Sequence, residues 1–175
     1  MYAQGDTIVY NLTLNKKTIN ITGKDKKAMA INDQIPGPVL RFKEGDYAVI
    51  YVKNEMEVES SVHWHGLILP NFYDGVPYLT TPPIKSGGVQ KYEFPLLHSG
   101  TYWYHSHTGL QEQSGIYGAI VIEPKENKLE YDKELVLMFS DWTDENPDKV
   151  LKNLKRKNEW YSIKRNTVTP LAKVI

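Results

Sequence analysis

The chain has 175 residues, no cysteine and a formal net charge of zero. The balanced charge gives no indication of nucleic acid or an anionic membrane as a partner. The absence of cysteine excludes disulfides and thiolate metal ligands. No apolar run reaches the roughly 18 residues that a membrane-spanning helix needs. The length suffices for one full domain and part of another.

Residues 1–124 have the pattern of an all-β domain. Short segments of alternating or continuous apolar residues are separated by turns rich in glycine, proline, asparagine and aspartate. Strands are predicted over residues 6–14, 18–22, 28–31, 39–42, 47–53, 61–69, 89–95, 101–107 and 116–122. Residues 47–53 have the composition of a central strand, and Lys16-Lys17 is predicted to be a turn. This succession predicts a Greek-key sandwich or barrel.

Residues 125–175 follow a different pattern. A charged linker over 125–128 leads to the apolar run Glu134 to Phe139, which suits a buried strand. Asn146 and Pro147 then open a predicted helix, with asparagine as the cap and proline in the first turn. One strand and one short helix cannot bury a core alone. We therefore predict that 125–175 is a linker and the truncated start of a second domain.

Two histidine pairs stand out, His63-Trp64-His65 and His105-Ser106-His107, and together they hold four of the five histidines. Side chains at i and i+2 of a strand leave the same face, so each pair presents two imidazoles together. Two such strands side by side would bring four imidazoles to one place. Imidazole is a common ligand of transition metals, and the pattern therefore indicates a metal site.

The alternative is that these are ordinary structural histidines, because a single pair at this spacing is weak evidence. The fifth histidine, His98, has no partner at strand spacing, and we interpret it as structural. Strand alternation also predicts that Trp64 and Trp103 face away from the neighbouring histidines and pack in the core.

The segments HWHGLILPNFYDGVPYLTTPPIKSGG and HSGTYWYHSHTGLQEQSGIYGAIVIEP resemble the N-terminal cupredoxin domain of multicopper oxidases, the laccase-like family. The tail ELVLMFSDWTDENPDKVLKNL is similar to the start of domain two in the bacterial copper-resistance branch. The resemblance implies a cupredoxin-like Greek-key sandwich over 1–124 and copper as the cofactor. It also implies that His63 binds the type 2 copper and that His65, His105 and His107 bind the type 3 pair of a trinuclear cluster.

Asp74 lies in the segment Tyr73-Asp74-Gly75, where related oxidases have an acidic residue that helps deliver protons to oxygen. A carboxylate near copper-bound water can relay protons, while Asp-Gly is also ordinary turn chemistry. Two-domain nitrite reductases have a Cys ligand where Ser106 stands and a Met ligand where Ile116 stands. The resemblance therefore implies that this domain is not a blue-copper centre.

The family implies that the intact enzyme oxidises Cu(I) or a phenol and reduces dioxygen to water. It further implies that the remaining histidines come from later cupredoxin domains of the same polypeptide, and that the location is periplasmic or secreted. We expect these 175 residues alone to lack oxidase activity. Two alternatives stay open: a stand-alone copper-binding or carrier module, and a β-sandwich that uses the site structurally with zinc.

Overall fold

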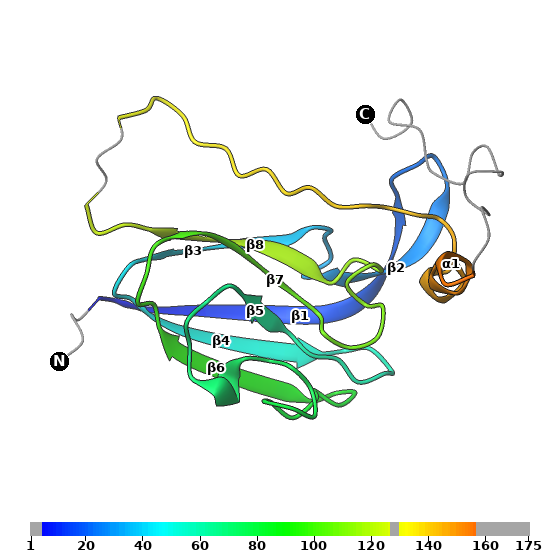
Figure 1. Ribbon diagram of the computed structural model, residues 1–175, viewed down its shortest axis with the longest axis horizontal. Coiled ribbons are helices and arrows are strands. Elements are labelled where there is room, and N and C mark those ends of the chain that lie inside the picture. The colour runs from blue at the N-terminus through cyan, green and yellow to red at the C-terminus, as the bar shows by residue number, and fades with distance from the viewer. Residues whose placement is uncertain (1–4, 127–129, 157–175) are drawn as a thin grey trace.

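The computed structural model describes residues 5–126 and 130–156. Two four-stranded sheets form the two layers of a sandwich, with strand orders β2-β1-β4-β6 and β3-β8-β7-β5 (Figure 1). The elements in chain order are β1 (Thr7–Asn20), β2 (Asp25–Ile31), β3 (Gly37–Lys43), β4 (Tyr47–Asn54), β5 (His63–His65), the 3-10 turn η1 (Asn71–Tyr73), β6 (Val89–Pro95), β7 (Gly100–His105), β8 (Tyr117–Glu123) and α1 (Pro147–Leu154).

The topology mixes parallel and antiparallel pairs. β1 runs parallel to β4 and β3 runs parallel to β8, whereas the other neighbouring strands are antiparallel. The predicted all-β sandwich is therefore confirmed. β4 lies between β1 and β6, which confirms that residues 47–53 form a central strand.

The core lies between the two sheets and follows from the alternation of apolar residues. Ile50 and Val52 of β4 point inward and are fully buried, and so is Leu12 of β1. They meet Trp64 and Tyr104 from the opposite sheet in one continuous cluster. Burial of large apolar side chains is the main favourable contribution to folding. Through Trp64 and Tyr104, the strands that carry histidines, β5 and β7, are therefore packed against this core.

One predicted turn is wrong. Lys16 and Lys17 lie inside β1, where they pair with Met29 and Ala28 of β2. Both lysine side chains are exposed at this end of the sheet, so their charged groups stay in water although the backbone is paired. The chain reverses later, near Gly23, whose φ of +89° suits glycine. β1 and β2 therefore form a long hairpin that extends beyond the sandwich.

The tail forms only one of its two predicted elements. Helix α1 is confirmed, and the side chain of Asn146 caps it by accepting from the backbone N–H groups of Asp148 and Lys149. The strand predicted over 134–139 is not formed. Leu135, Leu137 and Phe139 are 82%, 72% and 88% exposed, because the described part of the chain offers no strand to pair with this segment.

The segment that leads to α1 nevertheless touches the sandwich at defined points. Arg41 pairs with Glu134 at 2.8 Å, and the hydroxyls of Tyr117 and Ser140 lie 2.6 Å apart. Between these anchors, residues 136–141 line a cavity of about 490 Å³ together with residues of β7, of β8 and of the loop between them. In Figure 1 this segment arches over the sheet of β3, β8 and β7.

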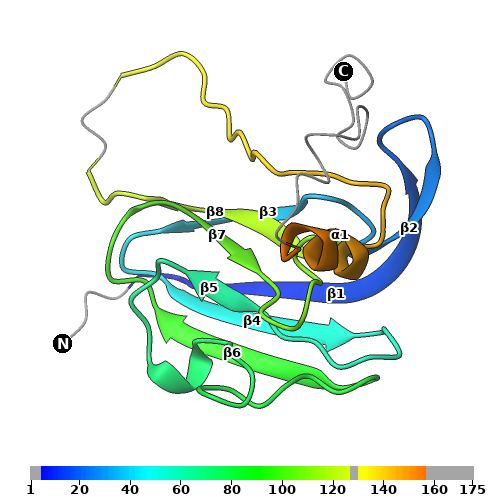
Figure 2. The same cartoon turned by 45° about the vertical axis from the view of Figure 1, so that its right-hand side comes forward.

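The β1–β2 hairpin contacts the residues just before α1, and Figure 2 shows the helix beside the hairpin. Lys26 donates to the backbone carbonyls of Thr143 and Glu145, and its ammonium lies 5.2 Å from the centre of the Trp142 ring. Thr22 donates to Asp144 at 2.6 Å. Among the described residues, no helix is long and apolar enough to cross a membrane.

Candidate metal centre

The two histidine pairs meet because β5 and β7 are antiparallel neighbours at the end of one sheet. His63 lies opposite His105, and His65 lies opposite Trp103. The residues between the paired histidines point the other way, since Trp64 and Ser106 are buried. The alternation predicted from the sequence thus places the imidazoles together on the outer face of the sheet.

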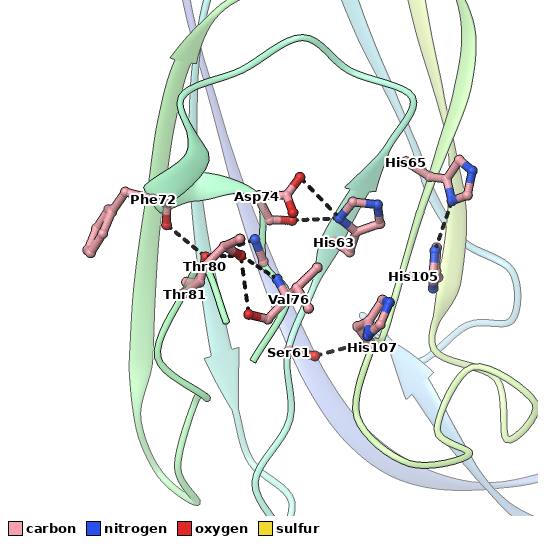
Figure 3. Close-up of polar contacts among 11 residues, drawn as sticks. Ser61, His63, His65, Phe72, Asp74, Val76, Thr80, Thr81, His105 and His107 are labelled. Carbon is pink, nitrogen blue, oxygen red and sulfur yellow. Dashed lines mark hydrogen bonds and ion pairs between the residues drawn. The ribbon is translucent and has the colours of Figure 1, made fainter. Parts of the chain in front are cut away.

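Three of the four rings form a tight group. Ring nitrogens of His63, His65 and His105 all lie within 4.8 Å of one another. The ring centre of His107 lies 5.8 Å from that of His63 and 6.1 Å from that of His105. The convergence predicted for the two pairs is therefore present, with His107 at the side of a closer group of three (Figure 3).

Both histidine strands are shorter than predicted. β5 ends at His65 because Gly66 turns the chain at a φ of +84°, and Leu67 then bonds back to the carbonyl of Trp64. β7 ends at His105, so His107 lies beyond the strand. The backbone N–H of His107 donates to the hydroxyl of Ser61 at 3.0 Å. Ser61, two residues before the first histidine pair, thus fixes the backbone of His107.

The loop after β5 folds back onto His63. The carbonyl oxygen of Asp74 lies 2.7 Å from Nδ1 of His63 and its carboxylate lies 3.5 Å away. A carbonyl can only accept, so Nδ1 carries a proton and Nε2 is the nitrogen of His63 that is left to bind a metal. Gly75 makes this approach possible: its φ is +83°, and a Cβ there would collide with the carbonyl of Val62. Thr81 closes the loop by accepting from the N–H of Gly75 at 2.8 Å (Figure 3).

His105 is the most buried of the four, with a side chain 8% exposed. Its Nδ1 lies 2.9 Å from the carbonyl oxygen of Ser106 and 3.1 Å from a carboxylate oxygen of Glu112. Burial lowers the pKa of His105 from 6.5 to about 4; the bond to Ser106 opposes this shift, and repulsion from the other imidazoles of the group adds to it. At neutral pH the ring is therefore uncharged, and Nε2 can act as a ligand.

Trp103 corrects one prediction. It does not pack in the core but is half-buried on the histidine face, where it stacks on His105 and on His65 with ring centres 4.1 and 4.9 Å apart. The reason lies in the alternation itself, because Trp103 is two residues before His105 and shares its face. Trp64 is buried, as predicted.

A buried amide anchors the loop that follows the second pair. The carbonyl oxygen of the Gln111 side chain accepts from the hydroxyls of Ser60 at 2.6 Å and Ser106 at 2.9 Å. Its amide nitrogen donates to the backbone carbonyl of Glu59 at 2.8 Å. The approaches to both histidine strands are therefore joined through one side chain. Sequence analysis missed Gln111 and Glu112, since no spacing rule marks residues in an irregular loop.

The donor set fits a copper ion. Nδ1 of His65 and Nε2 of His105 lie 3.3 Å apart, the separation expected of two nitrogens that share one ion at bonds of about 2.0–2.1 Å. Uncharged imidazole suits copper as well as zinc. His65 and His107 are exposed, so the group opens to solvent on one side. His98 lies apart from this group, against the ring of Tyr102.

A two-sheet sandwich with these histidines on one outer face defines a cupredoxin-type, metal-binding domain. A sequence profile described as "Multicopper oxidase" matches residues 13–127. Copper resistance protein A of Escherichia coli is 49% identical over 160 residues, which cover 91% of this chain and 26% of that protein. Laccase-1 of Cryptococcus neoformans is 34% identical over 149 residues, 81% of this chain and 24% of that protein.

Solved structures agree. A mutant of the laccase from B. aclada superposes with a TM-score of 0.80 at 34% identity, covering 87% of this chain and 29% of that one. Fet3p, a multicopper oxidase that functions in iron import, gives a TM-score of 0.77 at 35% identity, covering 84% and 29%. The chain belongs to the multicopper oxidase family, whose cofactor is copper. It spans about a quarter of the length of the curated relatives it matches.

Proposed function

We propose that this chain supplies half of the trinuclear copper cluster of a multicopper oxidase, at which dioxygen is reduced to water. The observation that carries the proposal is the group of His63, His65 and His105, with ligand atoms within 4.8 Å of one another. In this proposal His63 holds the type 2 copper, and His65, His105 and His107 hold the type 3 pair. Copper bound there supplies one-electron redox chemistry.

The protein groups around the histidines prepare them for this role. The hydrogen bonds at Nδ1 of His63 and His105 direct Nε2 of each ring into the group. The exposed side of the group, at His65 and His107, leaves room for ligands from elsewhere. Asp74 has its carboxylate 3.5 Å from His63, close enough to hold a proton beside the site. We propose Asp74 as the proton relay of the complete enzyme.

We further propose that other domains of the same polypeptide complete the site, and that residues 125–175 begin the second of them. The exposed apolar side chains of Leu135, Leu137 and Phe139 support this, since such a row suits the inner face of a sheet. In the complete enzyme the electron donor is Cu(I) or a phenol. We also propose a periplasmic or secreted location, which the resemblance to the family supports, and cell fractionation tests it.

Copper titration of the 175-residue chain tests the proposal. We expect the chain to bind copper, His63→Ala and His105→Ala to bind it much more weakly, and His98→Ala to bind it as the unaltered chain does. Equal binding by all variants would place the copper elsewhere. With Cu(II) and a phenolic reporter, the chain alone should show no turnover, because half of the ligands are missing. Sustained turnover would contradict that expectation and favour a self-sufficient site.

A further inference from the structure

Glu112 lies in the loop between β7 and β8, and the fold determines where its side chain can reach. The preceding residue, Gln111, is buried and bonded to Ser60, Ser106 and the backbone of Glu59. The carbonyl of Glu112 itself accepts from the backbone N–H of Gly115 at 3.0 Å. The backbone of Glu112 is therefore fixed on both sides, and its carboxylate lies beside His105.

There the carboxylate has one ionisable partner. Oε2 of Glu112 lies 3.1 Å from Nδ1 of His105, and among the described residues no other ionisable group lies within 4.0 Å of this carboxylate in an acid–base pair. The side chain of Glu112 is 34% exposed while that of His105 is 8% exposed. The contact is thus shielded from water on the histidine side, where an electrostatic interaction is stronger than at the surface.

The hydrogen bond of this nitrogen goes to the carbonyl of Ser106 at 2.9 Å. The carboxylate of Glu112 contacts the same nitrogen at 3.1 Å, and the two oxygens have different effects. The carbonyl is enough to keep the proton on Nδ1, whereas the carboxylate adds a negative charge behind the ring. A negative charge at one nitrogen of an imidazole makes the other nitrogen a stronger donor to a metal.

We propose that Glu112 is a positioning residue for the copper site, acting through His105. With an oxygen 3.1 Å from Nδ1 of His105, its carboxylate holds the ring in place and, through its negative charge, strengthens the donation of Nε2 to copper. This inference rests on the proposed function in one respect, since it takes His105 to be a copper ligand. His63 has a related arrangement, with a carbonyl at 2.7 Å and the carboxylate of Asp74 at 3.5 Å.

Two variants of the 175-residue chain separate the charge of Glu112 from the contact made by its oxygen. Glu112→Gln keeps the size and an acceptor oxygen but removes the charge, and Glu112→Ala removes both. Glu55→Gln is the matched control, because Glu55 is an exposed glutamate paired with Lys53 at 2.7 Å, away from the histidines. Thermal unfolding of each chain verifies that it is folded.

The first measurement needs no copper. Nitrogen-15 NMR of the histidine rings should find His105 protonated at Nδ1, with a proton that exchanges slowly. In Glu112→Ala this proton should exchange faster and resonate upfield, while the control should match the unaltered chain. The second measurement is an anaerobic competition titration with Cu(I). We expect both Glu112 variants to lose about tenfold or more in affinity, the usual effect of removing a group that supports a metal ligand.

The possible results are distinct. Unchanged His105 ring signals and unchanged Cu(I) affinity in both Glu112 variants would overturn the positioning role. Copper binding that survives in His105→Ala would instead overturn the proposed function, and the ring signals would still decide whether Glu112 holds His105. A loss in Glu112→Ala with full affinity in Glu112→Gln would limit the role to the contact of the side-chain oxygen and contradict the contribution of charge.

Discussion

The indole of Trp103 stacks on the imidazole of His105, with ring centres 4.1 Å apart and planes 20° from parallel. An aromatic contact of this kind contributes about 0.5–1.5 kcal/mol beyond its buried area. We expect Trp103→Ala to weaken Cu(I) binding by about three- to tenfold, because the ring of His105 loses its support. Trp103→Phe should retain most of the affinity, and a competition titration measures both. An alanine variant with full affinity would show that the stack has no part in orienting the ligand.

Gln111 joins the two histidine strands, and its removal should cost stability. In Gln111→Ala the hydroxyls of Ser60 and Ser106 and the carbonyl of Glu59 lose their partner in a buried place. We expect the free energy of unfolding to fall by about 1–3 kcal/mol, the range for an unsatisfied buried polar group. Urea unfolding measures it. Gln113→Ala is the matched control, since Gln113 is exposed two residues away, and it should be nearly neutral.

Two glycines separate backbone strain from collision. Gly75 and Gly23 have similar φ values of +83° and +89°, but only at Gly75 would a Cβ meet another residue, the carbonyl of Val62. Gly23→Ala should cost about 1 kcal/mol for the conformation alone. Gly75→Ala should cost clearly more and should also displace the carbonyl of Asp74 from His63. Comparative urea unfolding tests the ranking, and equal losses would contradict it.

The lowered pKa of His105 predicts a pH dependence of the copper-free chain. The pKa is about 4 in the folded state and 6.5 without the fold, so between these values the unfolded chain binds more protons. Stability is therefore lost as the pH falls from about 6.5 to 4. In His105→Gln the free energy of unfolding should fall less over this pH range, because the contribution of this one titrating group is gone. Urea unfolding at several pH values measures it, and an identical pH profile in the variant would refute the assignment to His105.

Lys26 should control how firmly the segment before α1 is attached. Lys26→Ala removes the donor to the carbonyls of Thr143 and Glu145 and the contact with the Trp142 ring. We expect limited proteolysis within residues 130–146 to accelerate, because this segment then opens more often. Lys27→Ala is the control on the same strand, where the side chain is exposed. Equal cleavage of the two variants would show that the segment is held in another way.

The sequence allowed the sandwich and the meeting of the histidines to be predicted because both follow from a period of two. Residues 47–53, predicted from their composition as a central strand, form β4 with alternate side chains buried, and the spacing of His63 and His65 puts both on one face. The same rule would have placed Trp103 beside His105, so that error was avoidable. Other features depend on distant parts of the chain.

Those features were out of reach for physical reasons. Lys16 continues β1 because β2 pairs with it, and a local turn signal cannot register that partner. Glu112 reaches His105 from an irregular loop whose course is set by the buried Gln111. The apolar run that ends at Phe139 predicted a buried strand, but its side chains stay exposed because no strand of the described residues pairs with it.

The β1–β2 hairpin reaches past the edge of its own sandwich and fastens the chain just before α1, through Thr22 and Lys26. The hairpin therefore sets the direction in which α1 leaves the sandwich. Substitutions at Thr22 and Lys26 should change that direction while leaving the imidazoles untouched.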